Sequence, residues 1–87
     1  MNPLYQEGRY AEAADRAAPL ADAHPEYPGL AYNTACVESL AGRTEQALEH
    51  LRRAVEGGTR FREFAADDTD LDAIRDEPAF KELIAGS

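Results

Sequence analysis

Hydrophobic residues recur every three to four positions along most of this chain, which is the spacing of helices with one buried face. The pattern predicts helices over residues 9–23, 28–41, 45–56 and 60–66, a single turn over 71–74 and a last helix over 77–85. Strand-like alternation is absent and β-branched residues are few, so the pattern predicts an all-α fold.

The first predicted helix contains an internal proline, Pro19. A proline inside a helix removes one backbone hydrogen bond and clashes with the preceding turn. Because Leu20 and Ala21 continue the apolar face, we expect a helix kinked near Ala17 and Ala18 rather than one that ends early.

Glycines and capping residues set the predicted helix boundaries. Gly42 follows the second helix and Gly57–Gly58 follows the third, as expected for helix C-termini. Thr44 is expected to cap the third helix, and Asp70 and Asp76 to cap the helical segments of the tail.

Two stretches of the chain match each other 34 residues apart. Residues 8–13 read Gly-Arg-Tyr-Ala-Glu-Ala and residues 42–47 read Gly-Arg-Thr-Glu-Gln-Ala. This period is typical of stacked helix–turn–helix repeats. The single predicted domain, 1–87, therefore divides into a partial first repeat (1–27), a complete repeat (28–58) and a helical cap (59–87).

These positions resemble the tetratricopeptide repeat (TPR) family. The small residues Ala35, Ala47 and Ala54 match its alanine spacing, and the earlier copy matches at four positions: Gly8, Tyr10, Ala13 and Pro25. Residues 32–36, 70–72 and 75–80 resemble a bacterial form that ends in a helical terminator. The resemblance implies a short TPR-like α-α superhelix of about one and a half repeats with a C-terminal helical cap.

The chain departs from the family pattern at several positions. Ala31 and Glu38 stand where the family usually has a large aromatic residue and a tyrosine. Leu20 and Thr59 replace an alanine and the closing proline. These differences affect the expected packing more than the expected topology.

The resemblance implies a protein-binding function. In this family the first helix of each pair lines a concave groove for a peptide or a helix, and by position Tyr32, Asn33, Cys36 and Ser39 would face it. The alternative is that Tyr32 and Asn33 only contact the terminal cap. The expected partner is a protein or peptide whose identity the sequence does not give.

A second function class follows from the shortness of the array. Repeats of this kind need about three copies to be stable alone. The helix over 9–23 lacks most of a partner, so Tyr10, Ala14 and Ala17 are expected to be exposed, or covered by a second copy of this chain or by a helix of a longer parent protein. The chain would then be a structural unit that self-associates into a homo-oligomer through this edge.

The formal net charge of −8 argues against nucleic acid and anionic membranes as direct partners. Acidic residues concentrate in 63–77, just after a basic group formed by Arg52, Arg53, Arg60 and Arg62. Two interpretations stay open: solvated faces that partly neutralise each other, or an acidic surface on which a basic ligand docks.

No group of residues predicts catalysis, a metal or a cofactor. His24 and His50 are far apart without a partner at ligand spacing, and we expect both on the surface. Residues 68–72 begin like a calcium loop but lack its glycine at Ala73. Cys36 has no neighbouring base that would activate it, and the other carboxylates are expected on solvated ground with ordinary pKa values.

The sequence also predicts a cytoplasmic location. Cys36 is the single cysteine, so an internal disulfide is impossible. The N-terminus lacks the pattern of a signal peptide, and no apolar run approaches the ~20 residues of a membrane span.

Overall fold

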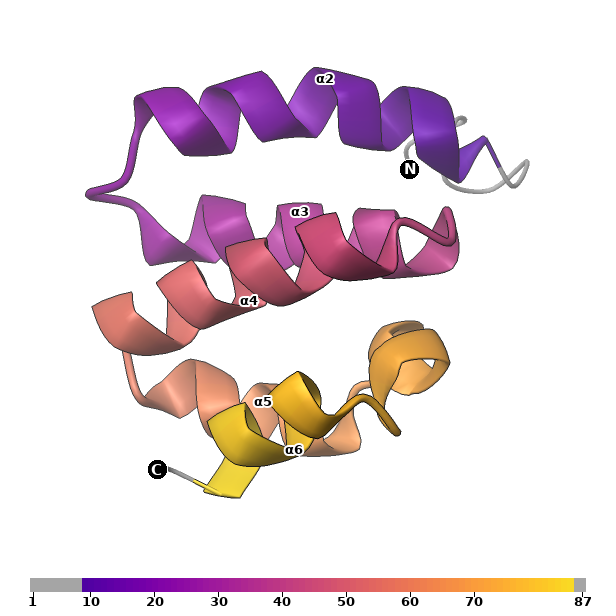
Figure 1. Cartoon of the computed structure of the whole chain (residues 1–87). Coiled ribbons are helices and arrows are strands. Elements are labelled where there is room, and N and C mark those ends of the chain that lie inside the picture. Colours follow the sequence, from indigo (N-terminus) through magenta and orange to yellow (C-terminus); the bar gives the residue numbers. More distant parts are fainter. Residues whose placement is uncertain (1–8, 86–87) are drawn as a thin grey trace.

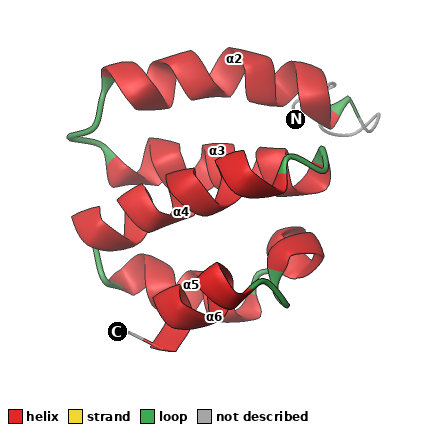
Figure 2. Ribbon diagram, viewed as in Figure 1, coloured by secondary structure: helices red, strands yellow, loops and turns green. Residues whose placement is uncertain are grey.

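The computed structural model describes residues 9–85, and every regular element in this range is a helix (Figures 1 and 2). The elements are α2 (Tyr10–Ala23), α3 (Pro28–Leu40), α4 (Thr44–Gly57), α5 (Arg60–Asp67), the 3-10 helix η1 (Thr69–Ile74) and α6 (Pro78–Ala85). The all-α prediction is confirmed, with element bounds close to those expected from the hydrophobic pattern. None of the described helices is long and apolar enough to cross a membrane.

Helix α2 runs through Pro19 without interruption. The expectation that the helix continues past the proline is confirmed, and the alternative of an early end is wrong. Pro19 is exposed. The small residues Ala13, Ala14 and Ala21 form the buried side of α2.

Two predicted helix caps differ from the structure. Thr44 is the first residue of α4 rather than its cap, and the preceding Arg43 makes no side-chain capping bond. Asp68, not Asp70, caps η1, because its side chain accepts a hydrogen bond from the Asp70 backbone N–H. Both corrections move the boundary by only one or two residues.

The turn between α3 and α4 is closed by glycine in the left-handed region. Gly42 has a φ of +80°, which glycine adopts without the steric cost of a side chain. The Arg43 N–H donates to the Glu38 carbonyl (2.9 Å) and the Gly42 N–H to the Ser39 carbonyl (3.1 Å). This is the Schellman arrangement that ends a helix, as the position of Gly42 in the sequence indicated.

Helix α3 is the centre of the molecule, and it packs against α2, α4 and η1. Figure 1 shows α2, α3 and α4 stacked side by side, with α5 and α6 below them and η1 at one end. The fully buried Leu51, Leu71 and Ile74 join α4 and η1 to this core. At the end of α4, a Cβ added to Gly57 would lie 2.7 Å from the Pro28 Cβ, so only glycine allows this approach.

Arg75 holds the C-terminal segment together. Its guanidinium donates to the backbone carbonyls of Ala65, Ala66 and Asp68 (3.3, 2.8 and 2.6 Å), which lie at the end of α5. The last carbonyls of a helix lack partners within the helix, and a cation also complements the helix dipole there. The same guanidinium lies 5.3 Å from the ring centre of Phe80 on α6.

Candidate functional site

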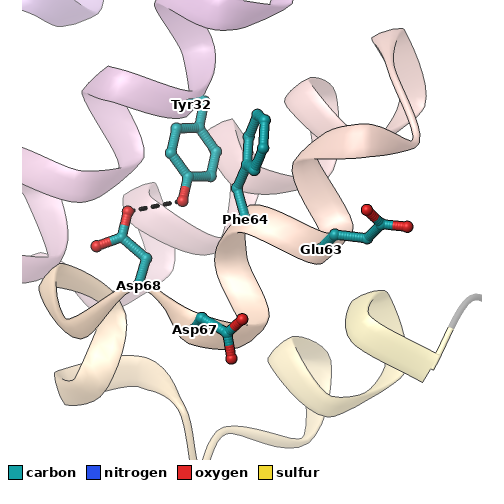
Figure 3. A pocket seen from close by; sticks show the side chains of 5 residues that line it. All are labelled: Tyr32, Glu63, Phe64, Asp67 and Asp68. Carbon is teal, nitrogen blue, oxygen red and sulfur yellow. Dashed lines mark hydrogen bonds between the residues drawn. The ribbon is translucent and has the colours of Figure 1, made fainter.

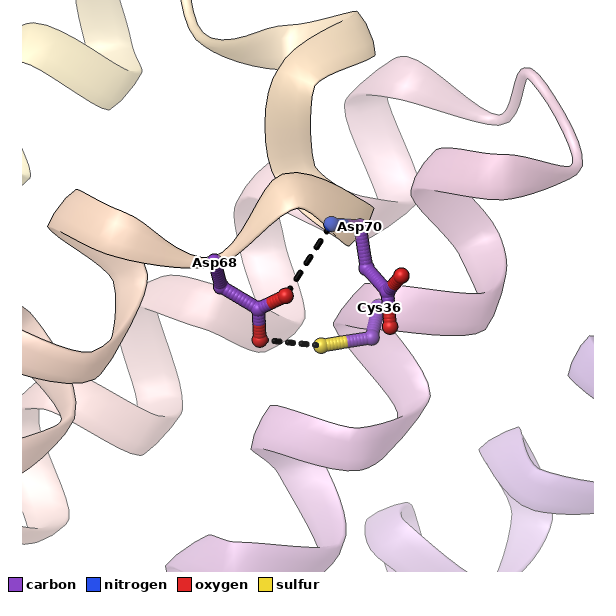
Figure 4. A group of neighbouring side chains, drawn as sticks. All are labelled: Cys36, Asp68 and Asp70. Carbon is purple, nitrogen blue, oxygen red and sulfur yellow. Dashed lines mark hydrogen bonds between the residues drawn. The ribbon is translucent and has the colours of Figure 1, made fainter.

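Asp68 joins two residues on one side of α3 to the C-terminal segment. The Tyr32 hydroxyl donates to Asp68 Oδ2 at 2.7 Å, and Cys36 Sγ lies 3.6 Å from the same oxygen. Asp68 Oδ1 accepts from the Asp70 N–H at 3.0 Å (Figure 4). Because Tyr32 and Cys36 are one turn apart on α3, they present both donors to one carboxylate.

Three aromatic rings meet beside this carboxylate. The rings of Tyr32 and Phe61 stack with centres 5.3 Å apart. Phe64 meets both edge-on, 6.3 Å from Tyr32 and 5.7 Å from Phe61. Tyr32 and Phe61 are buried, but 51% of Phe64 remains exposed. Phe64 is therefore an apolar side chain fixed by its neighbours and open to solvent.

A hollow of about 540 Å³ lies over this cluster. Tyr32 from α3, the side chains of Glu63, Phe64 and Asp67 from α5, and Asp68 line it (Figure 3). Two aromatic rings thus stand among three carboxylates. We call this surface the aromatic–acidic hollow.

Burial and the Asp68 carboxylate keep the two α3 donors protonated. Burial raises the pKa of Cys36 to about 12, and the nearby Asp68 charge adds to the shift. The same causes raise the pKa of Tyr32 well above its ordinary value. Cys36 is therefore a thiol at neutral pH, which makes it a poor nucleophile.

Cys36, Asp68 and Asp70 bring three atoms of metal-ligand type within 4.8 Å of one another. The contacts of Asp68 in this group are hydrogen bonds from protein donors, the Cys36 thiol and the Asp70 backbone N–H. These hydrogen bonds hold the start of η1 against α3.

The residues predicted to line a groove on α3 have different positions. Tyr32 contacts the terminal cap, as the alternative interpretation expected, while one edge of it also lines the hollow. Asn33 is exposed. Cys36 and Ser39 are buried, so the prediction that they face an open groove is wrong for these two. Within residues 9–85, the buried Ser39 Oγ has no hydrogen-bond partner.

The α2 residues predicted to mediate self-association are partly buried within the chain itself. Ala14 is fully buried within this single chain, so the expectation that it needs another chain to cover it is wrong. Tyr10 and Ala17 are half-buried. The packing of small α2 residues toward α3 explains the difference, since alanines allow a close approach of two helices.

His50 is buried, contrary to the expectation of a surface histidine. Its Nδ1 lies 2.6 Å from Glu38 Oε1, and its Nε2 lies 3.0 Å from Asp22 Oδ1. Asp22 also accepts from Arg53 at 2.6 Å. The ring thus joins α2, α3 and α4 through a polar cluster of the buried Glu38 and His50 and the exposed Asp22 and Arg53, which we call the histidine cluster.

Glu38 also differs from the sequence-based expectation, which was that the carboxylates of this chain are exposed to solvent. Its side chain is buried, and this burial raises its pKa, although His50 opposes the shift. Asp22 has a lowered pKa because it accepts from His50 and Arg53. Either an imidazolium between two carboxylates or a neutral ring accepting from a protonated Glu38 satisfies the geometry, and Asp22, Glu38 and His50 carry one net negative charge in both.

The sequence contained only an indirect signal for the hollow. Glu63 and Asp67 belong to the acidic stretch 63–77, for which a basic ligand was one open interpretation. Phe64 was expected to be part of a helix, and its half-exposed position follows only from the way α5 packs on α3. For the histidine cluster the sequence gave no signal, because its hydrogen-bonded pairs are 12 to 31 positions apart.

Comparisons with protein families, with curated proteins and with solved structures found no match to this chain.

Proposed function

We propose that this chain is a non-catalytic protein-interaction module of the TPR type, which binds a peptide or a helix in the aromatic–acidic hollow. The observation that carries the proposal is Phe64, an aromatic side chain held by two neighbouring rings yet half exposed at the floor of a hollow. Fixed aromatic side chains of this kind supply contact area at little entropic cost when a partner binds.

The arrangement of the helices supports the repeat type. Helices α2 and α4 each contain 14 residues, and their first residues, Tyr10 and Thr44, are 34 positions apart. With this 34-residue period, α3 and α5 correspond to the first helices of two successive pairs. In the TPR family, which this chain resembles, the first helix of each pair lines the groove. The hollow lies between α3 and α5.

The chemistry of the buried groups supports binding rather than catalysis. Cys36 is protonated and buried. Both ring nitrogens of His50 are engaged by carboxylates, so the ring has no nitrogen directed at a substrate. The groups that most resemble catalytic residues are thus occupied in holding helices together.

Selection from an unbiased library of displayed dodecapeptides tests the proposal. Peptides selected on the wild-type protein should bind Phe64→Ala at least about fivefold more weakly, because an aromatic anchor contributes strongly to binding. The matched control is Tyr27→Ala, which removes an aromatic side chain that is 59% exposed and does not line the hollow. If Phe64→Ala folds and binds the selected peptides as tightly as the control, the proposal is wrong.

Self-association through α2 is the alternative function. Leu20, 57% exposed, is an apolar residue of α2 that a second copy could cover. Sedimentation over a hundredfold range of concentration decides it: a constant monomer mass contradicts the oligomer, and a mass that rises with concentration and falls in Leu20→Asp supports it.

A further inference from the structure

We propose that the side chain bound by the aromatic–acidic hollow is an arginine, presented by an exposed basic segment of a protein partner. This inference rests on the proposed function and adds the chemistry of the ligand. It follows from the unpaired charges of the hollow, from the open aromatic surface and from the shape of the guanidinium group.

The carboxylates of the hollow lack cationic partners. Elsewhere in residues 9–85, acidic side chains such as Glu12, Asp15, Glu49 and Asp72 form ion pairs with arginines. Within the same range, neither Glu63 nor Asp67 has such a partner. The hollow is therefore a local excess of negative charge on a chain that neutralises several of its other carboxylates internally.

The spacing of Glu63 and Asp67 along α5 adds electrostatic repulsion between their carboxylates. Glu63 and Asp67 are four residues apart on α5, and like charges at this spacing destabilise a helix. A cation bound between them would remove that repulsion. The arginines of α5 do not supply it, because Arg60 lies over the Phe61 ring at 4.8 Å and Arg62 donates to the Leu83 carbonyl at 2.9 Å.

The aromatic surface selects among cations. A guanidinium stacks on an aromatic face and presents planar N–H donors to carboxylates at the same time, whereas an ammonium is a strongly hydrated point charge. The half-exposed Phe64 ring stands one turn from Asp67 and Asp68 on the same chain segment. An arginine side chain thus matches both components of the hollow, and a lysine matches mainly the charge.

The experiment uses four acetylated and amidated heptapeptides with glycine and serine flanks and a variable central pair. The pairs are Arg-Arg, Lys-Lys, citrulline–citrulline and Glu-Glu, titrated into the full chain and followed by ¹H–¹⁵N NMR. We expect saturable shifts centred on Tyr32, Phe64 and Asp67 with Arg-Arg, about threefold weaker binding with Lys-Lys and at least about fivefold weaker binding with citrulline. Citrulline keeps the shape of arginine but loses the charge.

Two matched double variants test whether the Arg-Arg peptide binds at the carboxylates of the hollow. The double variant Glu63→Gln with Asp67→Asn should reduce Arg-Arg affinity at least about fivefold and weaken its salt dependence. The control is Glu45→Gln with Glu77→Gln, which removes the same charge from exposed residues that do not line the hollow. Circular dichroism checks that both variants are folded.

Each remaining outcome contradicts the arginine inference in a distinguishable way. The arginine inference is wrong if the citrulline peptide binds at the hollow as tightly as the Arg-Arg peptide. It is also wrong if library-selected peptides need Phe64 but carry no arginine. Either result leaves the proposed function in place. Arg-Arg shifts that persist in the Glu63–Asp67 variant would show unspecific attraction to an acidic chain. Hollow resonances that move with protein concentration alone would identify a second copy as the occupant. Failure of every peptide, selected or synthetic, would overturn both proposals.

Discussion

Helix α3 carries two polar clusters on different sides, and they are built on opposite principles. In the histidine cluster the central groups are buried and paired: Glu38 and His50 are buried, and the His50 ring lies between two carboxylates from other helices. The aromatic–acidic hollow is half open: Asp68 is satisfied by Tyr32 and Cys36, but Glu63, Phe64 and Asp67 beside it face solvent.

The difference separates structural polar groups from groups available to a partner. A buried ionisable group is tolerated only when its partners are in place, so the contacts of the histidine cluster are used up in holding α2, α3 and α4 together. The hollow keeps charges without cationic partners and an aromatic ring with free surface. Substitutions in the two clusters should therefore affect different measurements.

The largest effect on stability is expected in the histidine cluster. Glu38→Ala leaves the buried His50 without its closest partner and should lower the free energy of unfolding by about 3 kcal/mol. Urea denaturation followed by circular dichroism measures the change, with the exposed Glu45→Ala as control. A loss below about 1 kcal/mol would mean that the cluster is not a structural one.

Tyr32→Phe should have the next largest effect. It removes the hydroxyl that donates to Asp68 at 2.7 Å and leaves the ring in contact with Phe61. Hydrogen bonds to charged groups contribute about 1.5–3 kcal/mol, so we expect a loss of about 2 kcal/mol in urea denaturation. An unchanged stability would indicate that water replaces the hydroxyl and that the link between α3 and the cap is weak.

Cys36 should make the hollow side of α3 sensitive to alkali. Its pKa is about 12 in the folded chain against an ordinary value of 9.0, so its contribution to stability is complete below about pH 9 and is lost as the pH rises toward 12. We expect the melting temperature to fall less between pH 8.5 and 10.5 in Cys36→Ala than in the wild type. Equal slopes would contradict the burial of the thiol. Tyr32, whose pKa is also raised, accounts for part of the remaining slope.

Phe64→Ala should have the smallest effect on stability. The side chain is half exposed, so its removal is expected to change the free energy of unfolding by less than about 1 kcal/mol while it weakens peptide binding. Denaturation and peptide titration on the same preparation measure the two effects. A large loss of stability with unchanged peptide binding would show that Phe64 has a structural role and does not contact the peptide.

The sequence was sufficient to predict the helical elements, and it predicted their ends to within one or two residues. The spacing of apolar residues predicted the helices, and Gly42 predicted the turn after α3, because a positive φ is a local property that glycine alone adopts at low cost. The caps were less accurate: Asp68 replaces Asp70, since the competing carboxylates are two positions apart and only the backbone path selects one.

The tertiary structure decided which polar residues are buried and which are open. Glu38 and Ser39 follow each other on α3, yet Glu38 meets His50 while the Ser39 Oγ has no partner in the described chain. His50 looked like a surface residue because its carboxylate partners come from helices that are distant in sequence. Helical periodicity fixes which residues share a face, but the partner of that face depends on how the helices stack, and the same stacking leaves Phe64 half exposed beside unpaired carboxylates.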